Sequence, residues 1–165
     1  MTAPFPEISA PPRRITILGS TGSIGCSTID LVERQPESFS VAALTAFSNV
    51  SLLAEQARKL QPELVVIGDE SRFKELKEAL SESGMEIAAG RDALIEAAKR
   101  PSDFVMAAIV GAAGLEPTLA AVRRGTTVGL ANKECLVCAG DLMKAELEKS
   151  GSTLLPVDSE HSAIY

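Results

Sequence analysis

The chain has 165 residues, of which 45% are hydrophobic, 23% are charged and 4% are aromatic, with no tryptophan. This length and composition are typical of one soluble domain with an aliphatic core. The formal net charge of −6 argues against a nucleic acid as partner, because such binding depends on clustered Lys and Arg side chains.

The first twelve residues, MTAPFPEISAPP, are rich in proline and lack the basic start and apolar stretch of a secretory signal. We expect residues 1–12 to form a flexible tail. The sequence contains no run of about 20 apolar residues that could span a bilayer. We therefore expect a cytoplasmic protein without a membrane partner.

The first predicted strand, 15–18, is followed directly by the glycine-rich sequence GSTGSIG. Glycines allow a tight turn and a close approach of a pyrophosphate, whose charge the free N–H groups and positive end of the next helix can bind. The segment predicts a dinucleotide phosphate loop, with a purely structural turn as the alternative. Its predicted cofactor-binding residues are Gly19, Ser20, Thr21, Gly22, Ser23 and Ile24.

The spacing of these glycines is GxxGxxG rather than the commoner GxGxxG, which predicts a wider loop. The loop also lacks the Lys of a nucleotide-triphosphate loop. A helix is predicted to begin near Ser23. Its buried face is expected at Ile24, Thr28, Leu31 and Val32.

A weaker strand candidate, 41–46, is followed by Phe47, Ser48 and Asn49. In dinucleotide-binding domains an Asp or Glu at this place accepts hydrogen bonds from the adenosine ribose and repels a 2′-phosphate. No acid is present here, and Ser48 and Asn49 can donate hydrogen bonds to a phosphate. We therefore predict NADP(H) rather than NAD(H), and Arg72 from a later helix is a candidate for the missing basic contact.

Further along the chain, aliphatic runs predict strands and segments with helical spacing predict helices between them. The strands are expected at 64–67, 85–88, 104–110, 126–130 and 153–157. The helical faces are expected at Leu53, Ala57 and Leu60, at Phe73, Leu76 and Leu80, and at Leu115, Leu119 and Val122. Gly84, Gly125 and Gly151 lie where helices should end.

The last predicted helix, 133–149, follows Asn132, which can cap it. Cys135 and Cys138 in this helix have CxxC spacing but no second Cys pair or nearby His, so we interpret them as packed helix residues. With Cys26 the number of cysteines is odd, which fits a reducing compartment better than a disulfide framework.

The predicted strands lack an alternation of apolar and polar residues, which indicates burial on both faces. Strands alternating with helices predict an α/β fold, a doubly wound and mostly parallel Rossmann-like sheet with helices on both faces. We expect this domain to span residues 13–157. Residues 158–165 are then the start of a second, truncated domain.

Two acids, Asp158 and Glu160, follow the last predicted strand. Hard divalent cations favour carboxylate oxygens, and an i, i+2 pair on extended backbone projects both acids to the same side. The pair therefore indicates a metal site or, equally well, a solvated acidic loop. His161, the single histidine, is expected to orient this loop rather than to transfer protons.

Four segments, GSTGSIG, AIVGAAGLEPTLAAVRRG, LANKECLV and LLPVDSEHSAIY, occur in this order with this spacing. Together they closely resemble the 1-deoxy-D-xylulose 5-phosphate reductoisomerase family, over residues 13–165. LANKE and VDSEH in combination are highly specific. The family enzymes are roughly twice this length, so the resemblance implies that this chain is their first, NADPH-binding part.

The resemblance implies that Asp158 and Glu160 are two of three carboxylates that hold Mg²⁺ or Mn²⁺, which makes this half of a metal site. Ser159 between them is implied to contact the substrate. In the same way, the resemblance assigns Lys133 to the substrate hydroxyls.

Two further segments are implied to contact the cofactor. Asn132 and Glu134 would bind it near the nicotinamide, whereas the alternative is a capped, charged helix start. The backbone of 107–111, including Ala108, would lie along the cofactor, and a buried strand end that needs small residues is compatible with this role.

The implied reaction is the NADPH-dependent conversion of a phosphosugar, 1-deoxy-D-xylulose 5-phosphate, into 2-C-methyl-D-erythritol 4-phosphate on the methylerythritol phosphate route to isoprenoids. The metal polarises the substrate oxygens and NADPH supplies the hydride. The family is usually homodimeric. We expect this chain to bind NADPH without turnover, because the third carboxylate, the phosphate site and the lid are missing. The alternatives are another NADP-dependent oxidoreductase, such as a semialdehyde or homoserine dehydrogenase, and a non-catalytic NADP-binding sensor module.

Overall fold

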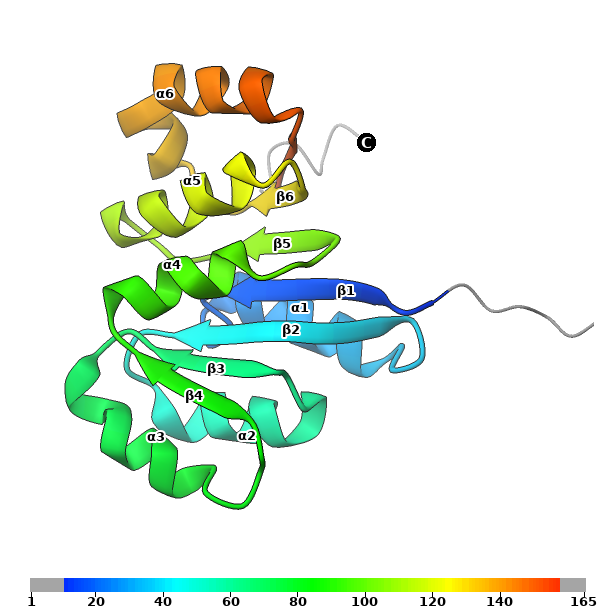
Figure 1. Ribbon diagram of the computed structural model, residues 1–165, viewed down its shortest axis with the longest axis vertical. Helices are drawn as coiled ribbons and strands as arrows, with labels where there is room; N and C mark the ends of the chain where they lie inside the picture. The colour runs from blue at the N-terminus through cyan, green and yellow to red at the C-terminus, as the bar shows by residue number, and fades with distance from the viewer. Residues whose placement is uncertain (1–10, 158–165) are drawn as a thin grey trace, which may run out of the picture.

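The computed structural model describes residues 11–157, which form one parallel sheet between two layers of helices (Figure 1). The strands are β1 (Arg13–Leu18), β2 (Phe39–Ala46), β3 (Leu64–Ile67), β4 (Glu86–Ala89), β5 (Phe104–Ala107), β6 (Thr127–Leu130) and β7 (Thr153–Pro156). The helices are α1 (Ser23–Glu33), α2 (Val50–Leu60), α3 (Phe73–Ala79), α4 (Arg91–Lys99), α5 (Leu115–Arg123) and α6 (Glu134–Ser150), with the 3₁₀ turns η1 (Glu70–Arg72) and η2 (Ala112–Gly114).

The strand order is β4-β3-β2-β1-β5-β6-β7, and every neighbouring pair is parallel. The order reverses between β1 and β5, so the loops that follow these two strands leave the sheet in opposite directions. In open α/β sheets this reversal creates the crevice in which ligands bind. The predicted doubly wound α/β fold is confirmed.

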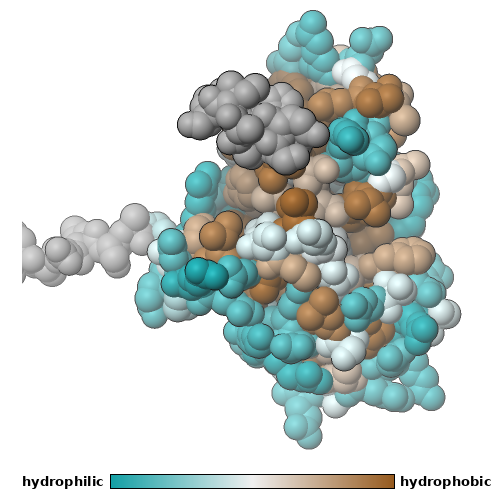
Figure 2. Space-filling model, turned by 180° about the vertical axis from the view of Figure 1, so that it is seen from behind, coloured by the Kyte–Doolittle hydropathy of each residue, from teal (hydrophilic) through white to brown (hydrophobic). Residues whose placement is uncertain are grey.

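The two faces of the sheet carry separate cores because successive side chains of a strand point to opposite sides. On one face Ile17, Leu44 and Val65 pack with α1, α2 and α3. On the other face Leu18 and Val105 pack with α4, α5 and α6. Each fully buried aliphatic side chain contributes roughly 1.5–3 kcal/mol. Seen from behind, hydrophilic residues line the lower rim and hydrophobic residues gather nearer the middle (Figure 2).

Helix α1 turns a different face to the sheet than the sequence predicted. Gly25, Ile29 and Val32 are buried, whereas Ile24 is 36% and Leu31 is 62% exposed. A Cβ atom at Gly25 would lie 2.2 Å from the carbonyl oxygen of Gly19. The close approach of the helix therefore requires glycine on the inner side, which rotates Ile24 and Leu31 outward.

Three further expectations about the elements need correction. The strand predicted at 104–110 ends at Ala107, because the chain turns away and reaches a positive φ of 70° at Gly111. Helix α4 was not predicted, since its buried positions include Ala97 and Ala98, and alanine gives a weak hydrophobic signal. Helix α6 has Lys133 at its N-cap without a side-chain bond, so Asn132 does not cap it.

The remaining strands and α6 agree with the predicted ones within about two residues. Gly84 does not end a helix, because α3 already ends at Ala79. Gly151 adopts the left-handed conformation that ends α6, with a φ of 70°. None of the helices in residues 11–157 is long and apolar enough to cross a membrane.

Candidate functional site

The loop after β1 is held between β2 and β5. The amide of Gly19 donates to the carbonyl and hydroxyl oxygens of Thr45, at 3.1 and 2.9 Å, and the amide of Ser20 donates to the same carbonyl at 2.7 Å. Gly19 has a φ of 83°, and a Cβ atom there would lie 2.7 Å from the carbonyl oxygen of Ala108. Only glycine fits this position, both for its dihedral angle and for the space available.

A buried hydrogen-bond pair fixes the same loop from the side of α2. The Ser20 hydroxyl donates to Oε1 of Gln56 at 2.7 Å, and Nε2 of Gln56 donates to the Ser20 carbonyl at 3.0 Å. Ser20 is 0% and Gln56 is 4% exposed. The Ser20 side chain therefore stabilises the loop from within, and both its side chain and its backbone amide are already paired within the protein.

The start of α1 presents unpaired amides at the carboxyl edge of the sheet. The first bond of the helix runs from the amide of Cys26 to the carbonyl of Gly22, at 2.8 Å. Among residues 11–157 the amides of Thr21, Ser23, Ile24 and Gly25 have no acceptor. The first turn contains no acidic side chain that would neutralise its positive end. Such a helix start binds anions.

Gly22 differs from the other two glycines of the loop. Its φ of −77° and ψ of 172° suit any residue. A Cβ atom there would meet the carbonyl oxygen of Gly19 at 3.5 Å, an ordinary contact. The fold itself therefore has room for a side chain at Gly22. Gly22 directly precedes the unpaired amides of Ser23 and Ile24, so a side chain added there would stand beside them in the chain.

The residues after β2 lie on the same edge. Phe47, Ser48 and Asn49 are exposed, and Oδ1 of Asn49 accepts a hydrogen bond from the amide of Leu52 at 3.2 Å. Asn49 thus caps α2 and retains its amide group as a donor. Arg72 contacts Glu75 at 2.9 Å within η1 and α3, so its guanidinium already has a carboxylate partner.

Asn132 connects the ends of β5 and β6. Its Nδ2 donates to the carbonyl oxygens of Ile109 and Gly111, at 2.6 and 2.8 Å. A Cβ atom at Gly114 would lie 2.5 Å from this Nδ2, so the loop packs tightly around the amide. Oδ1 of Asn132 is buried and has no partner among the described residues. The sequence suggested Asn132 as a helix cap, whereas its side chain instead connects the loops that follow β5 and β6.

The neighbours of Asn132 and the backbone across the crevice complete the described part of the site. Lys133 and Glu134 are exposed at the start of α6. Ala108 is 8% exposed, and its amide donates to the Leu18 carbonyl at 2.9 Å. Backbone and small residues therefore follow β1 and β5, and exposed charged side chains follow β6.

The two cysteines of α6 do not form a pair. Cys135 is buried, and this burial raises the pKa of its thiol, whereas Cys138 is exposed. No group of three or more His, Cys, Asp or Glu side chains suited to a metal occurs within residues 11–157. The prediction that both cysteines are packed helix residues is therefore confirmed for Cys135 and wrong for Cys138, which faces outward from α6.

Asp158, Ser159 and Glu160 lie outside the described residues, as do the predicted tail up to residue 10 and His161. The described chain ends beyond β7, where the amide of Val157 donates to the carbonyl of Leu130 at 2.9 Å. The structure adds Thr45 and Gln56 to the residues that shape the site. Gln56 was detectable in the sequence as a polar residue three positions after Leu53, on the buried face of its helix.

Comparison with known proteins gives concordant matches. A family model for 1-deoxy-D-xylulose 5-phosphate reductoisomerase matches residues 15–140. The enzyme of that name from Rhodospirillum centenum is 60% identical over 153 residues, which are 93% of this chain and 38% of the relative. A reductoisomerase from Zymomonas mobilis solved with NADPH is 56% identical, with a TM-score of 0.90 over 91% of this chain and 40% of that one. A reductoisomerase solved with NADPH, fosmidomycin and magnesium is 42% identical, with a TM-score of 0.87 over 93% of this chain and 38% of that one.

Proposed function

The chain belongs to the 1-deoxy-D-xylulose 5-phosphate reductoisomerase family, and from that premise we propose that it is the NADPH-binding domain of such an enzyme. The chain spans about two fifths of the length of the relatives it matches. We therefore propose the cofactor site for this chain, and the conversion of 1-deoxy-D-xylulose 5-phosphate into 2-C-methyl-D-erythritol 4-phosphate for the full-length protein.

The observation that carries the proposal is the row of unpaired amides in front of Gly22. The amides of Thr21, Ser23 and Ile24 can each donate to a phosphate oxygen, and the helix dipole adds to their attraction. Gly22 keeps the space in front of them open. This arrangement fits a dinucleotide pyrophosphate and explains how a protein with a net charge of −6 binds an anion.

The remaining cofactor contacts follow the crevice. Ser48 and Asn49 would donate to a 2′-phosphate, which is supported by their exposure beyond β2 and by the free amide group of Asn49. Ala108 would contact the cofactor through its backbone. On the family resemblance, Asn132 and Glu134 would hold the nicotinamide end, and Glu134 is exposed at the start of α6. NADPH, when bound, supplies the hydride for the reduction.

We assign the metal and substrate contacts on the family resemblance. Asp158 and Glu160 would hold Mg²⁺ or Mn²⁺ through carboxylate oxygens, which these ions prefer. Ser159 and Lys133 would contact the substrate hydroxyls, and Lys133 is exposed at the start of α6, on the carboxyl side of β6. The homodimer and the cytoplasmic location expected from the sequence remain proposals for the full-length protein.

The proposal is tested by titrating the chain with NADPH and with NADH in a calorimeter. We expect saturable binding of NADPH and an affinity for NADH at least about tenfold lower, because Ser48 and Asn49 contact only a 2′-phosphate. Equal affinities would contradict the assignment of the 2′-phosphate site. A folded chain that gives no heat with either nucleotide would refute the cofactor function itself.

Family membership favours this function over a semialdehyde or homoserine dehydrogenase. The non-catalytic sensor is separated from the enzyme by Asp158→Ala with Glu160→Ala in a full-length protein. We expect this variant to lose metal-dependent activity and to retain NADPH. A sensor would keep all its behaviour.

A further inference from the structure

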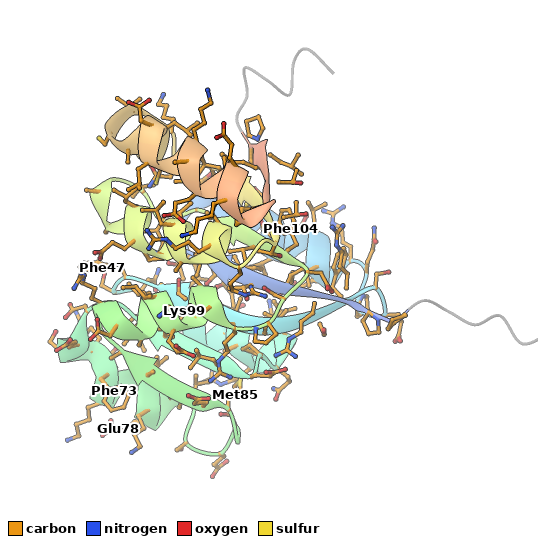
Figure 3. All side chains as sticks on the ribbon, turned by 45° about the horizontal axis from the view of Figure 1, so that its top comes forward. Phe47, Phe73, Glu78, Met85, Lys99 and Phe104 are labelled. Atoms are coloured by element: carbon orange, nitrogen blue, oxygen red, sulfur yellow. The ribbon has the colours of Figure 1, made fainter. Side chains whose placement is uncertain are left out.

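Phe47 is a large apolar side chain left open to solvent. It is 70% exposed, whereas Phe39, Phe73 and Phe104, the other aromatic residues of the described part, are all at least partly buried. Figure 3 shows it beyond the tips of the strands, on the opposite side from Phe104 at the start of β5. Ser48 and Asn49, which follow it, are exposed as well, so the ring stands beside polar groups that a ligand can reach.

The backbone on both sides of this ring is fixed. The carbonyl oxygen of Phe47 accepts a hydrogen bond from the amide of Asp69 at 2.8 Å, and the amide of Gly68 donates to the Ala46 carbonyl at 2.8 Å. The segments after β2 and β3 therefore continue the sheet pairing past the ends of the strands. Phe47 stands on a rigid connection rather than on a free loop.

The ring itself rests against Gly68. A Cβ atom at Gly68 would lie only 3.0 Å from Cδ2 of Phe47, so a larger residue there would push the ring away. Because Gly68 has no side chain, the ring of Phe47 can pack close to the backbone of this residue. Its other surface remains available, as the high exposure of Phe47 indicates.

Phe47 lies close to the phosphate loop and next to the proposed 2′-phosphate contacts. It follows Thr45, whose carbonyl oxygen binds the amides of Gly19 and Ser20, by two residues. Ser48 and Asn49 come directly after it. In a dinucleotide whose pyrophosphate lies on the loop and whose ribose faces Ser48, the adenine is the group that reaches this ring.

We propose that Phe47 is the platform on which the adenine ring of the bound dinucleotide stacks, an inference that rests on the proposed cofactor function. Stacking of a base on an aromatic side chain buries apolar area and adds a favourable contact between the two π-systems. Because the ring is already held against Gly68, little side-chain entropy is lost when the adenine binds. Phe47 thus contributes to affinity for the adenosine end and not to the nicotinamide end.

The test compares Phe47→Ala with Leu31→Ala, a control that also truncates an exposed apolar residue but lies on α1, away from this edge. Calorimetry is performed with NADPH and with 2′,5′-ADP, which carries the adenine and the 2′-phosphate without the nicotinamide. We expect Phe47→Ala to weaken both ligands by the same factor, about 5- to 30-fold. Leu31→Ala should bind both ligands as the unmodified chain does.

A second variant provides a direct signal. The chain contains no tryptophan, so Phe47→Trp introduces a single indole. We expect this variant to retain its affinity for 2′,5′-ADP and its emission to be quenched in proportion to the calorimetric saturation.

Two results would overturn the platform. One is an affinity of Phe47→Ala for 2′,5′-ADP within twofold of that of the unmodified chain. The other is an unchanged emission of Phe47→Trp under saturating 2′,5′-ADP. In either case the proposed cofactor function stands as long as the unmodified chain binds NADPH. If the unmodified chain binds neither NADPH nor 2′,5′-ADP, both the cofactor function and the role of Phe47 are refuted.

Discussion

Replacing Gly22 by alanine should separate binding from folding. The dihedral angles at Gly22 suit alanine, and the new methyl group would meet its nearest neighbour, the Gly19 carbonyl oxygen, at 3.5 Å. The lower entropy of the unfolded chain stabilises such a variant by about 0.4–1 kcal/mol, and the poorer helix cap offsets a similar amount. We expect the free energy of unfolding to change by less than about 1 kcal/mol.

Binding should respond very differently. We expect the methyl group of Gly22→Ala to crowd a pyrophosphate bound at the unpaired amides on either side of it. Each hydrogen bond to a charged group contributes about 1.5–3 kcal/mol. The loss of one or two such bonds weakens NADPH binding by about 10- to 100-fold.

Gly19→Ala and Gly84→Ala serve as matched controls. Gly19 and Gly84 both have positive φ angles, 83° and 71°, but a Cβ atom at Gly84 meets nothing within 4 Å. Gly84→Ala should therefore cost only the dihedral strain, about 1–2 kcal/mol. At Gly19 the overlap with the Ala108 carbonyl adds to that strain, for a total of about 2–5 kcal/mol.

The assay combines urea denaturation, followed by circular dichroism, with calorimetric titration of NADPH. Gly22→Ala with normal stability and lost binding is the expected result. Gly22→Ala that binds NADPH as tightly as the unmodified chain would refute the placement of the pyrophosphate. Equal stability of the Gly19 and Gly84 variants would refute the steric argument for the loop.

Three further outcomes are expected. Gln56→Leu should lower the free energy of unfolding by about 1–3 kcal/mol, because it leaves the buried hydroxyl of Ser20 without a partner; an unchanged denaturation midpoint would contradict this. Iodoacetamide should modify Cys138 well before Cys135, whose burial raises the pKa of its thiol; mass spectrometry of the native chain checks the order. Arg91 and Arg123 lower the pKa of Glu116 and Glu146, respectively. The stabilisation of the folded state by these two ion pairs is therefore complete above about pH 4.5 and is lost as the pH falls through the lowered pKa values. The melting temperature should accordingly decrease as the pH is lowered from about 4.5, and this decrease should be smaller in high salt. A melting temperature that does not change with pH in this range would contradict the argument.

The sequence predicted the sheet and the phosphate loop because both depend on local signals. Uninterrupted aliphatic runs such as 64–67 mark strands, and β3 is buried on both faces as expected. The edge strands β4 and β7 form where predicted but are not fully buried. The glycines at 19, 22 and 25 follow directly after the first strand. The structure explains Gly19 and Gly25, because a Cβ atom at these positions would lie only 2.7 and 2.2 Å from a backbone carbonyl oxygen. Spacing along the chain was sufficient in these cases.

The errors arose where a distant contact decides the local structure. The face of α1 is set by the approach of Gly25 to the Gly19 carbonyl, which outweighs the apolar side chains of Ile24 and Leu31. Asn132 resembles a helix cap in sequence, but two carbonyl oxygens more than twenty residues away bind its side chain instead. Neither interaction leaves a periodic signal, so neither was available from the sequence alone.

The loop after β1 is rigid, and this rigidity matters for binding. Thr45 holds its first two amides, Gln56 holds the Ser20 side chain, and the Ala108 carbonyl lies against Gly19. These bonds leave the amides of Thr21, Ser23, Ile24 and Gly25 as the donors without an acceptor at this end of the described sheet. Because these donors are fixed before a ligand arrives, a pyrophosphate loses little conformational entropy of the loop on binding. A substitution that loosens the loop without touching those amides, such as Gln56→Leu, should therefore weaken NADPH binding as well as stability.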